Sequence, residues 1–248
     1  MTVKTPKGWE HPYPELQSRL IIEQAIIKKH KNVRALVITD IHIGYYHDYD
    51  NDRMEFLKHL TEVIQKENPT DVFICGDLIH HSRELKDKQM FFSLFREFEK
   101  FKIPFWIIPG NHDFFVKFIE CCFNEYKGKY VHPIECDILI ATDKKNKHKI
   151  AFAHDFRIIG NGHRRPGVKW WFTYCKSQKK DFPEGIYFIC GHVHQDFDIF
   201  EENLSTLSPF CPSWKNYRYG IVSFDKKHGF TFRTNEENSN IRYFNKIQ

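Results

Sequence analysis

The sequence predicts a layered α/β domain with a mainly parallel sheet, and two observations support this prediction. In the first half of the chain, short apolar runs alternate with longer segments whose apolar residues recur at helical spacing. Strands that alternate with helices form βαβ units, in which the strands run parallel. In the second half, short apolar runs follow one another with turns between them, which indicates a second sheet.

The chain opens with an expected helical extension. Residues 14–30 carry Leu16, Leu20, Ile21 and Ile27 at helical spacing, which is typical of an amphipathic helix. We therefore expect two parts: residues 1–32 as a helical extension packed on the core, and residues 33–248 as the main domain.

Three strand–helix units follow the extension. Their strands are the apolar runs over 33–39, 71–75 and 103–108, and their helices are expected over 52–67, 86–100 and 114–126. The second half begins with a hairpin of residues 138–141 and 149–153, closed by a polar turn over 143–148. A helix over 167–178 is expected next. Further strands are then predicted at 186–190, 197–200, 203–207, 219–224 and 229–233.

Composition narrows the class of protein. The 248 residues are 41% hydrophobic and 28% charged, and the mean hydropathy is −0.55, which excludes an integral membrane protein. No apolar secretory signal opens the chain, and the seven cysteines form no CxxC pair. We expect small buried thiols, such as Cys75 and Cys190 in apolar runs, and a cytoplasmic location. The net charge of +5 permits a polyanionic substrate.

Polar residues follow five of the predicted strands. In α/β sheets, ligands bind beyond the carboxyl ends of the strands, so we expect these side chains to converge. They are Asp40, His42, Asp77, Asn111, His154, His192 and His194.

The chemistry of this set indicates metal binding. Carboxylate, amide oxygen and imidazole are a mixed oxygen and nitrogen donor set that suits Mn, Fe, Zn or a similar divalent ion. Seven donors are too many for one tetrahedral ion, whereas one bridging carboxylate could serve two ions. Paired divalent ions about 3.5–4 Å apart are a known arrangement for phosphoester displacement.

The ordered motifs resemble the calcineurin-like metallophosphoesterase family. They read Asp-x-His at 40–42, Gly-Asp at 76–77, Gly-Asn-His-Asp at 110–113, a histidine at 154 and Gly-His-x-His at 191–194. The resemblance implies a four-layer α/β/β/α sandwich of two mixed sheets flanked by helices, over about residues 33–234.

The resemblance also implies roles for individual residues. One ion would be bound by Asp40, His42 and His194, the other by Asn111, His154 and His192, with Asp77 bridging the two. His163 is the alternative to His154. His112 would stabilise or protonate the leaving oxygen, and Asp113 would orient His112. We expect two divalent ions, Mn²⁺ first, with Fe, Zn, Ni and Mg as alternatives.

Other residues could contact substrate. Arg164 and Arg165 precede Trp170-Trp171, and such a segment could bind phosphate and stack a base. His80 and His81 follow Asp77 closely enough to reach substrate. A solvated loop is the alternative interpretation for the two histidines, and a charged loop with its tryptophans packed into the core is the alternative for the arginine segment.

We expect hydrolysis of a phosphate mono- or diester, with a nucleotide or nucleic acid as substrate. The chain lacks the Gly-Asp-x-x-Asp-Arg-Gly and Gly-Asn-His-Glu patterns of the family's protein phosphatases, so protein phosphatase activity is disfavoured. Its motifs look more like the prokaryotic phosphodiesterase and repair-exonuclease branch, although few residues remain for a DNA-binding cap. The alternative is a catalytically silent scaffold or nucleic-acid-binding subunit. We expect no membrane partner, and the sequence leaves the oligomeric state open.

Overall fold

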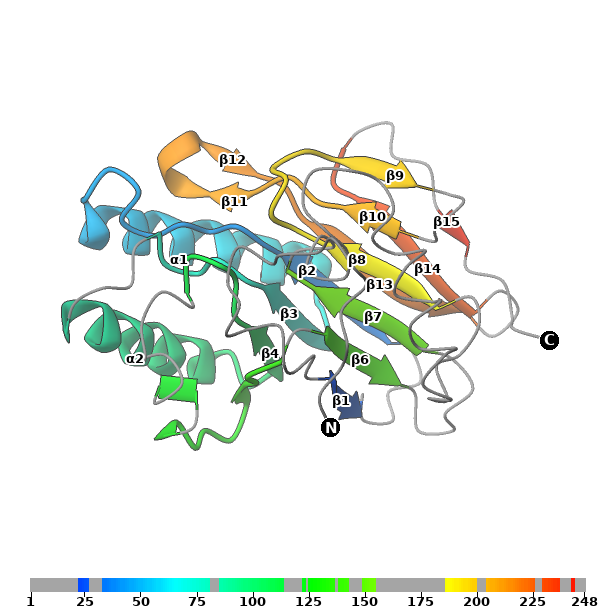
Figure 1. Ribbon diagram of the computed structural model, residues 1–248, viewed down its shortest axis with the longest axis horizontal. Helices are drawn as coiled ribbons and strands as arrows, with labels where there is room; N and C mark the ends of the chain where they lie inside the picture. Colours follow the sequence, from blue (N-terminus) through cyan, green and yellow to red (C-terminus); the bar gives the residue numbers. More distant parts are fainter. Residues whose placement is uncertain are drawn as a thin grey trace, which may run out of the picture.

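Two β-sheets form the centre of the molecule, as the computed structural model in Figure 1 shows. The structure describes residues 22–26, 33–80, 85–113, 122–123, 125–136, 138–142, 149–154, 186–199, 204–225, 229–236 and 242–243.

The first sheet has seven strands, and its central strands run parallel. The order is β15 (Arg242–Tyr243), β14 (Gly229–Thr234), β13 (Gly220–Asp225), β2 (Arg34–Ile38), β3 (Asp71–Cys75), β4 (Phe105–Ile108) and β5 (Val131–Pro133). In register, Leu36 of β2 lies opposite Val72, which lies opposite Phe105 of β4. β2 to β5 pair in parallel, as the βαβ pattern predicts, and β13 joins β2 antiparallel.

The second sheet has six strands. Its order is β1 (Ile22–Ile26), β6 (Ile138–Thr142), β7 (Lys149–Ala153), β8 (Tyr187–Cys190), β10 (Leu204–Thr206) and β9 (Phe197–Ile199). β6 and β7 are antiparallel, which confirms the predicted hairpin. A small separate hairpin of β11 (Phe210–Cys211) and β12 (Asn216–Tyr217) encloses the 3-10 helix η3 (Pro212–Trp214).

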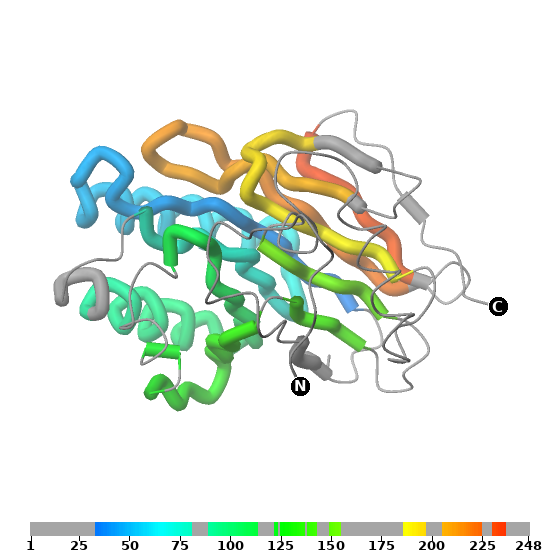
Figure 2. Tube along the Cα trace, viewed as in Figure 1, coloured from blue at the N-terminus to red at the C-terminus, as the bar shows by residue number. Residues whose placement is uncertain are grey.

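Two helices, α1 (Tyr49–Glu67) and α2 (Leu85–Lys100), lie together on one side of the molecule in Figures 1 and 2. Alternate residues of β2 show how the layers pack. Leu36 and Ile38 share a buried cluster with residues of the two helices, including Phe56 of α1. Val37 points the other way, into the cluster between the sheets, because successive side chains of a strand face opposite sides.

Burial of this apolar surface accounts for much of the stability. Each fully buried Leu or Phe side chain contributes about 1.5–3 kcal/mol relative to exposure. On the six-stranded sheet, Leu139 and Phe152 face the other sheet. Ile138 and Phe188, outside that cluster, are also fully buried, so both faces of this sheet are covered. The fold is therefore the predicted α/β sandwich of two mixed sheets.

The helix predicted over residues 14–30 is wrong where the structure describes it. Residues 22–26 form strand β1, which pairs in parallel with β6, with Ile22 opposite Ile138. Helical propensity is a weak preference, and the backbone hydrogen bonds offered by the edge of β6 override it here. The division of the chain at residue 33 stays a prediction.

Two other predicted helices are described little or not at all. The helix over 114–126 is described in part, and residues 122, 123 and 125 are helical. The helix over 167–178 lies outside the described residues. The five described cysteines are buried free thiols, as expected. Within the described part of the chain, no helix is long and apolar enough to cross a membrane.

Candidate metal centre

The loops that follow β2, β3, β4, β7 and β8 meet at one edge of the two sheets. All seven predicted metal ligands lie on these loops and are brought together there. Polar side chains from residues 40 to 194 therefore form one site because the carboxyl ends of these strands share an edge.

Asp40, His42 and His194 form the first donor group. Nε2 of His42 lies 3.2 Å from Nε2 of His194, and Oδ1 of Asp40 lies 3.4 Å from the same atom of His194. One donor atom from each residue lies within 4.8 Å of the other two, a spacing that could accommodate a metal ion.

The second donor group contains Asp77, Asn111, His154 and His192. Oδ1 of Asn111 lies 2.9 Å from Nε2 of His154 and 2.6 Å from Nδ1 of His192. The two imidazole nitrogens are 3.2 Å apart, and Oδ2 of Asp77 lies 3.3 Å from Nε2 of His154.

Asp77 lies between the two groups. Its Oδ2 is 3.7 Å from Nε2 of His42 in the first group and 3.3 Å from Nε2 of His154 in the second. The side chain is 1% exposed, and its Oδ1 accepts a hydrogen bond of 2.8 Å from the backbone N–H of His112. This position suits a bridging carboxylate.

The backbone at this site is unusual. Five of the predicted ligands have a positive φ between 50° and 70°, namely Asp40, His42, Asp77, His192 and His194. The left-handed conformation is uncommon for residues with a side chain and persists only where the surroundings impose it. At Asp40 and His42, hydrogen bonds between loops hold the backbone, from Asp40 N–H to the Gly76 carbonyl (3.1 Å) and from His42 N–H to the Asp77 carbonyl (2.9 Å).

Hydrogen bonds outside the donor groups orient the ligands. The Nδ1–H of His154 donates to the carbonyl of Cys75 at 2.9 Å, which directs Nε2 into the site. The backbone N–H of His192 donates to the Asp40 carboxylate at 2.9 Å. Gly110 passes so close to Asp77 that any side chain there would collide with the carboxylate.

The histidine pKa values shift in opposite directions in the two donor groups. Burial lowers the pKa of His42 to about 3 despite the carboxylates of Asp77 and Asp40, so this imidazole is neutral and can act as a ligand. Burial also opposes the charged forms of Asp77 and His154, but their mutual attraction outweighs it. The pKa of Asp77 is therefore lowered, and that of His154 is raised to about 10. A divalent cation could take the place of the proton that this pair retains.

Asp113 connects two loops of the site. Its carboxylate accepts backbone hydrogen bonds from Gly110 (2.9 Å), Leu78 (3.2 Å) and Ile79 (3.2 Å). Burial and the nearby Asp77 raise its pKa to about 7, against these hydrogen bonds. Asp113 thus joins the loops after β3 and β4, while its expected role toward His112 stays a prediction.

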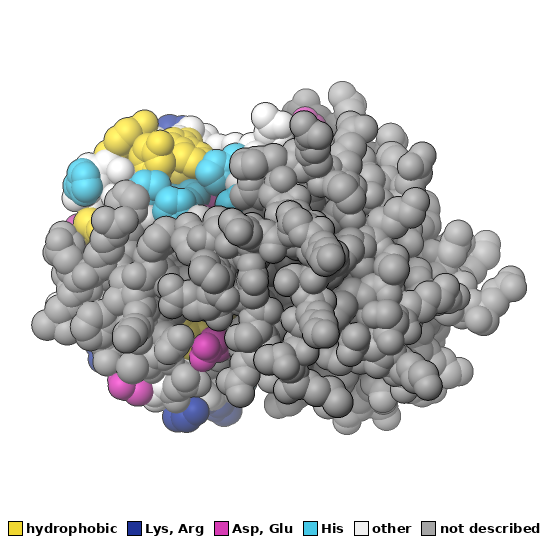
Figure 3. All heavy atoms as spheres, in the orientation of Figure 1, with side chains coloured by type: hydrophobic (Ala, Val, Ile, Leu, Met, Phe, Trp, Pro, Cys, Tyr) yellow, Lys and Arg dark blue, Asp and Glu magenta, His cyan; other side chains and the backbone are white. Residues whose placement is uncertain are grey.

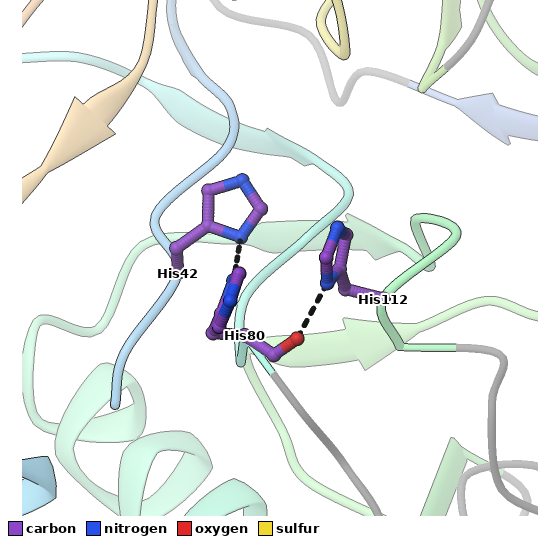
Figure 4. Close-up of side chains that lie close together, drawn as sticks. All are labelled: His42, His80 and His112. Atoms are coloured by element: carbon purple, nitrogen blue, oxygen red, sulfur yellow. Dashed lines mark hydrogen bonds between the residues drawn. The ribbon is translucent and has the colours of Figure 1, made fainter. Parts of the chain in front are cut away.

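His80 belongs to the site, although the sequence alone left it in a solvated loop or near substrate. It is half-buried, and its Nδ1 lies 3.2 Å from Nδ1 of His42 (Figure 4). Its ring stacks on that of His112 with centroids 4.7 Å apart, and the Nδ1–H of His112 donates to the His80 carbonyl at 2.5 Å. In the sequence, the only indication that His80 belongs to the site was its position three residues after Asp77.

Three predicted substrate-binding residues, His81, Arg164 and Arg165, lie outside the described residues. His163, the alternative to His154, lies outside them too. Figure 3 shows histidine side chains at the surface beside a hydrophobic patch, at the end of the molecule that carries β11 and β12.

The donors present fit a pair of divalent cations. Asp40 and Asp77 are buried carboxylates, and each belongs to a group whose other members include two histidines. Buried carboxylates require compensating charge, and mixed oxygen and nitrogen ligands suit transition-metal ions. Such a centre can bind an anionic ester and activate water.

Comparisons with known proteins identify the family of the chain. A solved structure that resembles the chain is the crystal structure of Pseudomonas putida nuclease MPE, with a TM-score of 0.39 and 17% identity, covering 71% of this chain and 74% of that one. No curated protein matches the chain. The family model for calcineurin-like phosphoesterases matches residues 33–196, more than half of the sequence and a range that contains all seven expected ligands. The chain therefore belongs to the calcineurin-like phosphoesterase family.

Proposed function

We propose that the protein is a two-metal phosphoesterase that hydrolyses phosphate esters of nucleotides or nucleic acid. One observation supports this more than any other. Asp77 lies within 3.7 Å of a histidine nitrogen in each of two adjacent donor groups, as a carboxylate shared by two ions would.

The two donor groups divide the ligands as follows. One ion would be bound by Asp40, His42 and His194, the other by Asn111, His154 and His192, with Asp77 shared. Bound divalent ions lower the pKa of water and neutralise charge on the phosphate oxygens. The mixed donor set supports Mn²⁺ first, with Fe, Zn, Ni or Mg as alternatives.

His112 is the proposed acid or charge-stabilising group. Its Nδ1–H is committed to the His80 carbonyl, so Nε2 is the nitrogen that can act on a leaving oxygen. The backbone N–H of His112 also donates to Asp77. This bond fixes the loop that carries the imidazole relative to the shared carboxylate.

A nucleotide or nucleic-acid substrate is supported by charge and by motif. The net charge of +5 permits a polyanionic substrate. The Gly-Asn-His-Asp motif differs from the Gly-Asn-His-Glu that is typical of protein phosphatases in the family.

The first test is hydrolysis of p-nitrophenyl phosphate and bis-p-nitrophenyl phosphate with Mn²⁺, before and after EDTA. We expect turnover that EDTA abolishes and added Mn²⁺ restores. A panel of 2′,3′- and 3′,5′-cyclic nucleotides, nucleotides, DNA and RNA then identifies the substrate class. The absence of turnover of every ester with every divalent ion would contradict the proposal and favour the silent scaffold.

A further inference from the structure

Three aromatic side chains line one side of the candidate metal centre. The ring of Trp214, on η3, lies 5.4 Å from that of His42 and 4.8 Å from that of His194. Tyr45, on the loop after His42, lies 4.9 Å from Trp214, and Tyr46 lies 4.8 Å from Tyr45. We call Tyr45, Tyr46 and Trp214 the aromatic wall.

The outermost ring of this wall is largely in solvent. Tyr46 is 67% exposed and, with Met54, is one of two large hydrophobic side chains that are exposed among the described residues. A ring in water beside a polar centre contributes little to folding, but it can bury its face against a flat ligand. Its exposure leaves the ring of Tyr46 accessible to a ligand.

The two loops that carry the wall are tied together by a buried carboxylate. Oδ2 of Asp52 accepts hydrogen bonds from the backbone N–H of Gly44 at 2.9 Å and from the Ser213 hydroxyl at 2.8 Å. Asp52 is 4% exposed. Gly44 has a φ of 86°, which favours glycine. Asp52 thus fixes Tyr45 and Tyr46 relative to Trp214 before any ligand binds.

We propose that the aromatic wall is a base-stacking subsite, which makes the substrate a nucleoside ester or a nucleic-acid strand. The inference rests on the proposed function, because it places the phosphoester at the metal centre and the base of the attached nucleoside on the wall. Aromatic rings stack any base through its π-face, so the subsite tolerates different sequences. Asp52 is its positioning residue.

The kinetic test compares two diesters with the same leaving group, thymidine 5′-(p-nitrophenyl phosphate) and methyl p-nitrophenyl phosphate. We expect the wild-type enzyme to prefer the nucleoside ester in kcat/KM, and Tyr46→Ala to reduce that preference about 5- to 10-fold. Tyr46→Phe, which keeps the ring, and Met54→Ala, which removes the other exposed apolar side chain, should leave the preference unchanged. A ratio within about twofold of wild type in Tyr46→Ala would overturn the subsite.

A binding test separates this inference from the proposed function. Fluorescence anisotropy would compare a thymidine tetranucleotide with its abasic analogue on the Mn²⁺-loaded protein. The subsite predicts at least about 5-fold tighter binding of the tetranucleotide, with the advantage reduced in Tyr46→Ala and in Asp52→Ala. Equal affinity for the two strands would refute the subsite even if esters are hydrolysed. A base-dependent affinity without turnover of any ester would retain the subsite and refute the proposed enzyme.

Discussion

Two buried carboxylate centres lie beyond opposite ends of strand β2, and they are neutralised in different ways. Arg34, at the start of β2, pairs with Glu67, which also binds Arg233 at 2.8 Å and the Tyr219 hydroxyl at 2.9 Å. Asp40, just after the end of β2, accepts hydrogen bonds from Thr39 (2.8 Å) and from the backbone N–H of His192 (2.9 Å).

The difference distinguishes a centre whose charge the protein itself neutralises from the candidate metal centre. Arginine is charged at any ordinary pH, so Glu67 is fully compensated by the protein itself. The centre of Asp40 and Asp77 has imidazoles instead, and burial makes at least His42 neutral. Buried charge without full compensation costs several kcal/mol, so bound cations would stabilise this second centre.

Substitution of the shared carboxylate should have the largest effect. We expect Asp77→Asn to lose both ions and all turnover, because Oδ2 of Asp77 approaches both donor groups. Elemental analysis and the bis-p-nitrophenyl phosphate assay measure this. Glu67→Gln is the matched control and should keep metal and activity. Two equivalents of metal in purified Asp77→Asn would show that the carboxylate is not a bridge.

The His112→Ala substitution should have the second-largest effect on turnover. We expect kcat to fall about 10²–10⁴-fold, the range for a positioned acid–base group, with the metal content unchanged. Measurement on esters with good and poor leaving groups distinguishes the roles of the imidazole. A larger loss for the poor leaving group indicates proton donation, whereas equal losses would argue against it and favour charge stabilisation.

Removal of metal should lower the free energy of unfolding, and the loss should not depend on Glu67. At a metal concentration one hundred times Kd, binding contributes about 2.7 kcal/mol to the free energy of unfolding. Urea unfolding with Mn²⁺ and with EDTA should show a loss of this order in both wild type and Glu67→Gln. A loss that depends on Glu67 would mean that the two centres are not independent.

The smallest effect is expected at Glu67. Burial opposes its charge, but the hydrogen bonds from Arg34 and Tyr219 and the charge of Arg233 lower its pKa below the usual value. A depressed carboxyl pKa stabilises the fold above the unfolded value of about 4.3, and the benefit is lost as the pH falls through the folded pKa. Glu67→Gln should therefore cost about 1–2 kcal/mol at pH 7 and much less at pH 3. Urea unfolding at both pH values checks this, and an equal cost at each would contradict it.

Hydrophobic periodicity predicted the secondary structure correctly in segments that showed one clear period. The apolar runs at β2, β3 and β4 and the helical spacing of α1 and α2 match the structure closely. The same reasoning failed at Ile22–Ile26, because a short segment with apolar residues at mixed spacing suits either a helix or a strand. The edge of β6, more than one hundred residues later, decided between them.

The sequence by itself determined which donors could meet, because residues placed just after buried strands share an edge once those strands pair. It therefore predicted that Asp40, Asp77, Asn111 and the histidines of the same loops would lie together, as they do. Only the tertiary structure decided the left-handed backbone at Asp40 and Asp77, the inclusion of His80, and the contact of Tyr45 with Trp214. These depend on hydrogen bonds and packing between loops far apart in the chain, for which no local pattern of residues exists.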